Sequence, residues 1–211
     1  MNYNDYKKAR DLSWLVLMEM KIKELPVVVS RICKAYGIRL LSYESGIDII
    51  RLLKHEKIRI ISDGFTACHN SQIFIFYNGN ATPERNRFTV AHELGHIFLG
   101  HIKRRDGEFT TINREPSSND NPLEQQANVF ASRLLAPACV LHELNITTPN
   151  DISKLCHISL TSAKYRSERI QLLNEREKDF KNSRGKSNYG LSPLERQVFE
   201  QFKDYIDKNK L

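Results

Sequence analysis

The sequence predicts an α+β protein that is mostly helical and contains one small β-sheet. Over most of the chain, apolar residues recur at the three- and four-residue spacing of amphipathic helices. One segment is instead typical of a strand and turn, because Gln72-Ile73-Phe74-Ile75-Phe76-Tyr77 runs into Asn78-Gly79-Asn80. A chain of 211 residues is long enough to bury one substantial core. We therefore expect a folded protein with several helices around a small sheet.

The first part of the chain is predicted to combine short helices with short strands. We expect a helix at residues 3–20 and a second helix that starts at Pro26 and is capped by Gly37, since proline favours the first turn of a helix and glycine its end. Residues 38–43 are expected to form a short strand. Residues 47–53 fit a helix or a strand, because periodicity does not separate the two in so short an apolar run.

A His-Glu-x-x-His motif occupies residues 92–96, within a predicted amphipathic helix that begins at Thr82. Residues four apart lie on the same face of a helix, so His92 and His96 can direct two imidazoles at one ion. Glu93 can then reach a water on that ion without binding the ion itself. A catalytic zinc site needs this arrangement, with three protein ligands, an open position for water and a carboxylate that accepts a proton.

A third ligand has to come from another segment, and Gly95 would let a second backbone pass close to the metal-bearing face. Apolar residues at helical spacing predict a second helix over residues 122–135. Glu124 and Asn128 share a face of this helix, so Glu124 can bind the ion while Asn128 orients a liganding histidine through a hydrogen bond. His101 is the competing ligand, but it lies one residue short of the spacing in the extended histidine motif. Glu124 is the better candidate, and His101 fits a polar residue at a helix end.

Two segments carry a family resemblance: Arg87-Phe88-Thr89-Val90-Ala91-His92-Glu93-Leu94-Gly95-His96 and Glu124-Gln125-Gln126-Ala127-Asn128-Val129-Phe130-Ala131-Ser132-Arg133-Leu134-Leu135-Ala136-Pro137. Together they resemble the ImmA/IrrE family of metallopeptidases, over about residues 26–169. The resemblance implies a zincin-like fold, Glu124 as the third zinc ligand, and cleavage of a transcriptional repressor. Asn128 departs from the family, where an aspartate is also common, and a neutral amide lends the histidine less basicity.

The resemblance also suggests how a peptide would be held. Zincins generally lay their substrate along the edge strand of a small sheet, and residues 72–77 form the clearest strand before the metal helix. We therefore expect residues 72–77 to be an edge strand. The polar segment 103–121 is expected to be a loop between the two metal-bearing helices, covering the cleft.

The chain is expected to divide into three parts. Residues 1–148 would form the zincin-like metallopeptidase domain, residues 149–173 a helix-turn-helix-like segment in which Ser159 caps the second helix, and residues 174–211 a charged linker followed by an amphipathic helix from Pro193. Four residues of the middle segment would face a DNA groove if it binds DNA, namely Thr161, Ser162, Lys164 and Tyr165. A structural or repressor-docking role for this segment is favoured over direct DNA binding.

Composition narrows the setting in which the protein works. The formal net charge of +7 is modestly basic and can attract nucleic acid or an acidic partner without specifying either. No apolar run is long enough to predict a membrane span. Cysteines 33, 68, 139 and 156 are scattered without a Cys-x-x-Cys pair, which indicates reduced thiols and a cytoplasmic protein.

The function predicted from these features is zinc-dependent hydrolysis of peptide bonds. His92, His96 and Glu124 would hold Zn²⁺, Glu93 would act as the general base, and Asn128 would orient a ligand. A helix-turn-helix repressor of a mobile element or stress response is the expected protein substrate, which would make the protein an anti-repressor. The alternatives are a DNA-binding regulator and an antitoxin-like protein that captures its partner without cutting it, each with a structural or vestigial zinc site.

Overall fold

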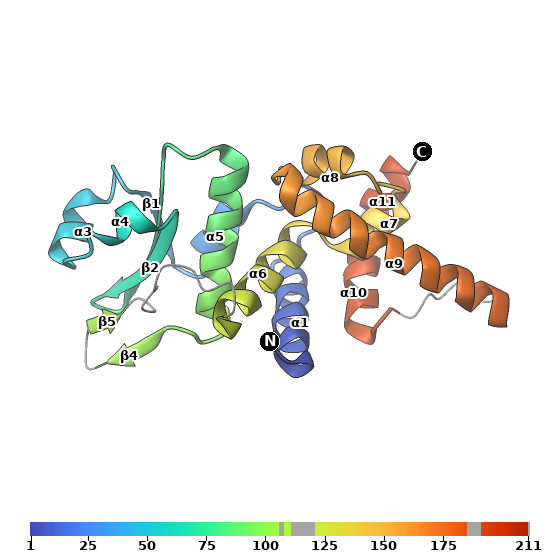
Figure 1. The fold of residues 1–211 in the computed structure, drawn as a ribbon, viewed down its shortest axis with the longest axis horizontal. Coiled ribbons are helices and arrows are strands. Elements are labelled where there is room, and N and C mark those ends of the chain that lie inside the picture. The colour runs from blue at the N-terminus through green and yellow to red at the C-terminus, as the bar shows by residue number, and fades with distance from the viewer. Residues whose placement is uncertain (106–107, 111–120, 185–190, 211) are drawn as a thin grey trace. The chain divides into compact units, whose positions relative to one another are not determined.

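The computed structural model describes residues 1–105, 108–110, 121–184 and 191–210, and it confirms an α+β fold that is mostly helical (Figure 1). The chain packs into two compact units. The first contains residues 1–9 and 28–131, and the second contains residues 10–27 and 132–211. The boundary between the units falls inside helices α1 (Tyr3–Glu19) and α6 (Pro122–Leu135). The division into three parts at residues 148 and 173 stays a prediction.

One sheet forms the centre of the first unit. Its strands are β1 (Arg39–Ser42), β2 (Gly64–His69), β3 (Gln72–Tyr77), β4 (Lys103–Arg105) and β5 (Glu108–Thr110), and their spatial order is β1-β3-β2-β5-β4. β3 pairs in parallel with β1 and antiparallel with β2. The prediction that residues 72–77 form an edge strand is therefore wrong. β3 lies between β1 and β2. The sequence of β2 is short and alternates only weakly between apolar and polar residues, so it gave no clear strand signal.

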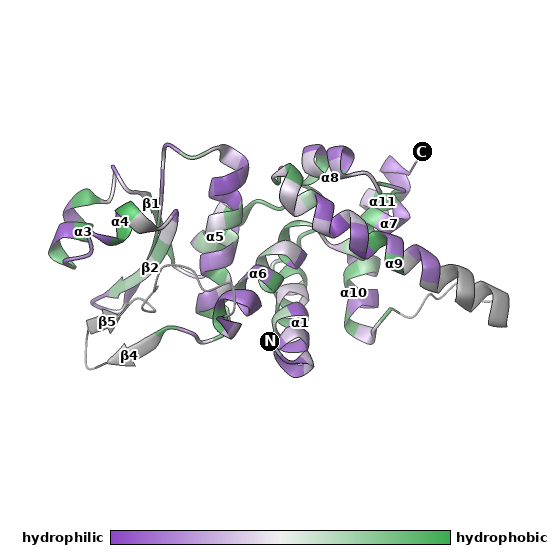
Figure 2. Cartoon of the chain, viewed as in Figure 1, coloured by the Kyte–Doolittle hydropathy of each residue, from purple (hydrophilic) through white to green (hydrophobic). Residues whose placement is uncertain are grey.

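The two faces of this sheet pack against different helices. Phe65, Phe74 and Phe76 are buried on one face, in a cluster that includes residues of α3 (Ile47–Leu52) and α4 (Ile58–Ile61). Hydrophobic residues on α3 and α4 are visible beside the sheet in Figure 2. Helix α5 (Pro83–Phe98) packs against the other face, so its motif lies directly beside β2 and β3.

Most predicted elements of the first unit are confirmed with small shifts in their bounds. The first helix matches α1, and residues 47–52 are helical. α2 (Val29–Ala35) starts later than Pro26, because the backbone of Val28 is extended, and Gly37 follows the helix with a left-handed φ of 65°. The segment 103–121, which was expected to be a loop covering the cleft, contains the strands β4 and β5. Residues 106–107 and 111–120 of this segment lie outside the described residues.

The second unit is built from helices. They include α7 (Ala138–Glu143), α8 (Pro149–Cys156), α9 (Leu160–Arg184), α10 (Pro193–Gln201) and α11 (Lys203–Asn209). α8 and α9 form the predicted helix-turn-helix-like pair: His157 adopts a left-handed φ of 51°, and the Ser159 hydroxyl accepts a hydrogen bond from the Ser162 amide. The last predicted helix is broken at Phe202 into α10 and α11, and residues 185–190 of the predicted linker lie outside the described residues.

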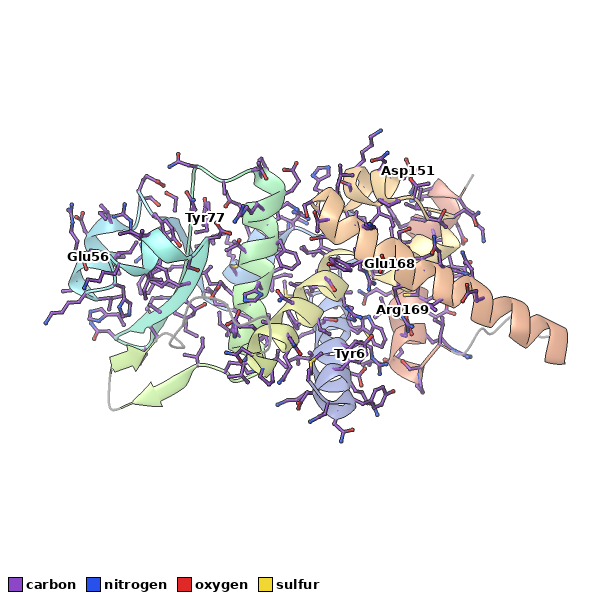
Figure 3. The ribbon with its side chains drawn as sticks, viewed as in Figure 1. Tyr6, Glu56, Tyr77, Asp151, Glu168 and Arg169 are labelled. Carbon is purple, nitrogen blue, oxygen red and sulfur yellow. The ribbon has the colours of Figure 1, made fainter. Side chains whose placement is uncertain are left out.

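The second unit buries the ionisable side chains of Arg166 and Glu195. The Arg166 guanidinium donates two hydrogen bonds to the Ala136 carbonyl, at 2.9 and 2.6 Å, and this closes the turn after α6. Glu195 on α10 is 7% exposed, and burial raises its pKa although the charges of Arg169, Arg10 and Arg166 oppose the shift. Figure 3 shows Arg169 on α9. No helix in the described ranges of the chain combines the length and apolar character of a membrane span.

Candidate metal centre

The site is formed where α5 and α6 approach each other closely. The Thr82 hydroxyl accepts a hydrogen bond from the Arg85 amide and fixes the start of α5, while the Asn121 side chain accepts one from the Leu123 amide at the start of α6. At Gly95 the two helices nearly touch, since a Cβ atom there would lie 3.1 Å from the Cα and 3.2 Å from the carbonyl oxygen of Ala127. The prediction that Gly95 admits a second backbone is confirmed.

Three predicted ligands converge at this contact. The Nε2 atoms of His92 and His96 are 2.9 Å apart, and the Glu124 carboxylate lies 3.0 Å from the first and 3.3 Å from the second. All three ligand atoms lie within 4.8 Å of one another. Ligands placed tetrahedrally at about 2.0–2.2 Å from a zinc ion are separated by about 3.3–3.6 Å. The observed separations are close to this range, so the donor set fits a metal ion after a small expansion.

The second ring nitrogen of His92 is held from α6. His92 Nδ1 lies 2.9 Å from Asn128 Oδ1. An imidazole that offers Nε2 to an ion carries its proton on Nδ1, so His92 donates and the Asn128 amide oxygen accepts. This contact is the one expected from the spacing of Glu124 and Asn128 along their helix.

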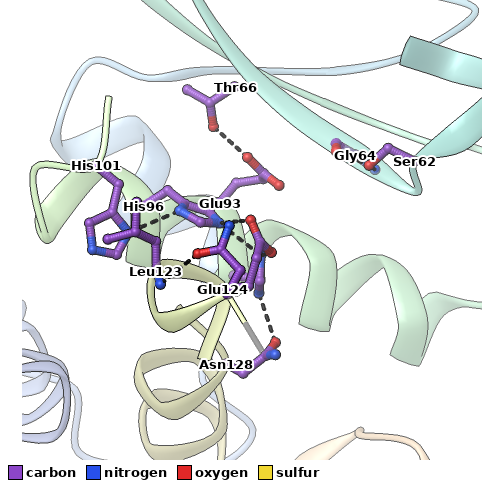
Figure 4. A network of polar contacts seen from close by, with 11 residues as sticks. Ser62, Gly64, Thr66, Glu93, His96, His101, Leu123, Glu124 and Asn128 are labelled. Carbon is purple, nitrogen blue, oxygen red and sulfur yellow. Dashed lines mark hydrogen bonds and ion pairs between the residues drawn. The ribbon is translucent and has the colours of Figure 1, made fainter. Parts of the chain in front are cut away.

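The second ring nitrogen of His96 is held by His101, at an Nδ1–Nδ1 distance of 3.0 Å (Figure 4). Helix α5 ends in a Schellman motif: Gly100 has a φ of 73°, its amide bonds the Ile97 carbonyl, and the His101 amide bonds the His96 carbonyl at 2.9 Å. The motif places His101, the residue after the glycine, next to His96, which begins the last turn of the helix. His101 therefore lies beside the predicted ligand His96, where its Nδ1 can accept a hydrogen bond from Nδ1–H of His96. Gly100 was the signal in the sequence that identifies this contact.

Hydrogen bonds favour an ionised Glu124, and burial favours a neutral His101. Burial alone would raise the pKa of Glu124, but hydrogen bonds from His92 and His96 outweigh it and hold the pKa well below the usual range. Burial lowers the pKa of His101 to about 4, and the neighbouring His96 adds to this effect. An ionised Glu124 supplies a negative ligand, and a neutral His101 retains a lone pair for the proton of His96.

Glu93 lies on the side of α5 that faces the sheet. It is 2% exposed, and its Oε2 atom accepts a hydrogen bond from the Thr66 hydroxyl at 2.8 Å. Figure 4 shows Glu93 between Thr66 and the liganding side chains. Thr66 belongs to β2, which the sequence did not predict, and it stands in no recognisable motif. The arrangement places a buried carboxylate next to three convergent ligands, which is suited to proton transfer from a water in the site.

Comparisons with known proteins agree with this geometry. The family model Peptidase_M78, described as an IrrE N-terminal-like domain, matches residues 44–168. The chain is similar to Metallopeptidase ImmA of Bacillus subtilis (strain 168), with 32% identity over 115 residues that cover 54% of this chain and 57% of that protein. The alignment thus spans little more than half the length of this curated relative. Because the family model covers more than half of the chain and includes both ligand-bearing helices, the chain belongs to the Peptidase_M78 family, which is the ImmA/IrrE family of metallopeptidases.

Proposed function

We propose that this protein is a zinc-dependent endopeptidase that cleaves a transcriptional repressor, and that His92, His96 and Glu124 are its metal ligands. The observation that carries the proposal is a buried carboxylate, Glu93, on the same helix as two ligands whose donor atoms converge with Glu124. A purely structural zinc site fills its fourth position with a protein ligand and has no use for a neighbouring base.

The chain's own residues would act in sequence on water and substrate. When bound, a zinc ion lowers the pKa of a coordinated water and polarises the scissile carbonyl. Glu93 accepts the proton of the attacking water and delivers it to the leaving amine. Asn128 and His101 keep the two ligand imidazoles in the tautomer that presents Nε2. The burial of His96 and Glu93 limits bulk water around the reacting groups.

The main chain of β2 offers a way to hold an extended peptide beside this site. The Asn78 amide bonds the Asp63 carbonyl, so Phe65, Ala67 and His69 turn their amides and carbonyls toward β3. The amide and carbonyl of Thr66 therefore point away from β3. In the described part of the chain, β5 pairs with β2 only at His69 and Glu108. A substrate strand added beside Thr66 would lie next to Glu93.

The test is co-expression of the protein with candidate helix-turn-helix repressors, followed by mass spectrometry of the products. Wild type should cut one of these repressors at a defined bond, and Glu93→Gln should leave it intact while retaining zinc. Glu84→Gln is a matched control, because it makes the same change in the first turn of the same helix. Cleavage that persists in Glu93→Gln would refute the assigned base. If wild type leaves every repressor intact, the substrate assignment is wrong.

The helix-turn-helix-like pair supports a second candidate, a DNA-binding regulator. Thr161, Lys164 and Tyr165 are exposed on α9, within the first two turns after the cap at Ser159. Sequence-selective DNA binding that falls steeply with salt and survives removal of the metal would favour this candidate. Zinc-dependent cleavage without such binding would favour the peptidase. Direct DNA binding is the less favoured of the two, since it leaves Glu93 and its neighbours without a role.

A further inference from the structure

The hydroxyl of Thr66 connects the sheet to the residue proposed as the base. Thr66 is 5% exposed, Glu93 is 2% exposed, and 27 residues of sequence separate them. The 2.8 Å hydrogen bond joins them directly. Neither ligand-bearing helix contains Thr66, so the contact depends on how β2 is placed against α5.

That placement follows because two residues of the strand and four residues of the helix cover nearly the same length. A Cβ atom on Gly64 would lie 2.3 Å from the Cγ2 atom of Thr89, so Gly64 lies over Thr89 as Thr66 lies over Glu93. Two residues along a strand advance about 6.6 Å, and four residues along a helix advance about 6.0 Å. β2 and α5 therefore stay in step over this distance. The lack of a side chain at Gly64 lets the strand approach closely enough for Thr66 to reach the carboxylate.

We infer that Thr66 is a positioning residue for Glu93, an inference that rests on the proposed peptidase function. The last torsion of a glutamate side chain has a broad, roughly two-fold energy profile, so packing alone fixes the plane of the carboxylate poorly. Threonine is branched at Cβ and stiff at χ1, and here its backbone is held in the sheet. A hydroxyl donor fixed in this way sets the orientation of the carboxylate toward the attacking water.

Thr66 also relates the base to the peptide. Its side chain holds Glu93 on one face of the sheet, while its amide and carbonyl lie in the plane of the sheet and point away from β3. Thr66 would thus contact both the substrate strand, through its main chain, and the Glu93 carboxylate, through its hydroxyl. The scissile bond and the base would keep their relative positions even if β2 shifts slightly along α5.

The alternative is that Thr66 is simply a buried hydroxyl that finds an acceptor, as buried polar groups must. The two roles differ in what happens when the hydroxyl is removed without a change in shape. Thr66→Val keeps the branched side chain and removes the donor. Thr66→Ser keeps the donor and removes the methyl group. Thr89→Val makes the isosteric change at the neighbouring β2–α5 contact and serves as the matched control.

In the cleavage assay, Thr66→Val should lower kcat about 10- to 100-fold, which is the usual loss when a hydrogen-bond partner of a metal-site residue is removed. KM and zinc content should stay close to those of wild type. Thr66→Ser and Thr89→Val should stay within about threefold of wild type. An equal loss of kcat in Thr66→Val and Thr66→Ser, or no loss of kcat in Thr66→Val, would overturn the inference. If Thr66→Val does not fold, the same comparison is made between Thr66→Ala and Thr66→Ser.

A second readout needs no substrate. In protein loaded with Co²⁺ in place of zinc, the visible absorption bands respond to the coordinated water and to the group that accepts its hydrogen. The spectrum of Thr66→Val should shift from that of wild type toward that of Glu93→Gln, and Thr66→Ser should match wild type. A wild-type spectrum in Thr66→Val would overturn the positioning role. The Co²⁺ spectra therefore test Thr66 even if no repressor is cut, in which case only the substrate assignment fails.

Discussion

Gly95→Ala tests whether close approach of two backbones is what forms the metal site. The new Cβ would lie 3.1 Å from the Cα of Ala127, 3.2 Å from its carbonyl oxygen and 3.2 Å from Cδ1 of Phe130. Two of these neighbours are backbone atoms, which cannot turn aside as a side chain can. The helices must separate by a few tenths of an ångström. His96 is carried by one helix and Glu124 by the other, so the ligands separate too.

The magnitude follows from two opposing effects on stability and one effect on the ligands. Overpacking a tight contact costs about 1–3 kcal/mol, whereas replacing glycine by alanine inside a helix gains about 0.8–1.0 kcal/mol. The zinc-free variant should therefore unfold with a free energy about 0–2 kcal/mol below that of wild type. The His96–Glu124 separation is already 3.3 Å, within the range expected around zinc, so a displacement of a few tenths of an ångström between the helices exceeds the about 0.2 Å that metal sites tolerate. Zinc affinity should therefore fall at least tenfold.

The assay combines urea unfolding of the zinc-free proteins with a competition titration of zinc against a chelator. The expected result is a small change in the free energy of unfolding together with a large change in zinc affinity. Wild-type zinc affinity in Gly95→Ala, at any stability, would refute the argument that the α5–α6 approach sets the ligand geometry. Complete unfolding of the zinc-free variant would show that the cost of overpacking has been underestimated.

Three further outcomes are expected. Glu124→Ala should lose the zinc that wild type retains at about one ion per chain, whereas Glu93→Gln should keep it and lose at least 100-fold in cleavage rate, as measured by metal analysis and kinetics. Asn128→Leu should weaken zinc binding about 10- to 100-fold, because His92 loses the acceptor for its Nδ1 proton, and Asn128→Asp should restore it in the same titration. Burial raises the pKa of Glu195 in the folded state above its unfolded value of about 4.3, so the folded protein binds this proton more tightly and the contribution of Glu195 to wild-type stability should fall as pH rises above about 4. Glu195→Gln should lack this pH-dependent loss in urea unfolding at pH 4 and pH 7, and an identical pH dependence in both proteins would contradict the assignment.

Local spacing along single helices predicted which side chains converge at the candidate metal centre. The four-residue separations of His92 from His96 and of Glu124 from Asn128 each place two side chains on one face, and the structure brings both faces together. Contacts between distant segments were harder to foresee. Thr66 reaches Glu93 only through the register of β2 on α5, and no residue spacing encodes that register.

The error about β3 has a similar cause. Gln72–Tyr77 is the most apolar strand segment of the first unit, and a strand has this pattern when both faces of its sheet are covered, here by α3 and α4 on one face and by α5 on the other. The same apolar run that made the strand easy to recognise was thus evidence for a central position. Its neighbour β2 mixes glycine, threonine and cysteine with apolar residues and was missed, although it carries Thr66, whose hydroxyl donates a hydrogen bond to Glu93.

The Schellman motif at the end of α5 has a dynamic consequence. The ends of helices open locally far more easily than their centres, often without disturbing the rest of the fold. Opening of the turn at Gly100 would break the hydrogen bond from the His101 amide to the His96 carbonyl and carry the His101 ring away from His96, the proposed ligand. Metal binding favours the closed turn and must therefore raise the free energy of opening it. Zinc should accordingly slow hydrogen–deuterium exchange at the amides of Gly100 and His101, so that the last turn of the helix reports on the occupancy of the site.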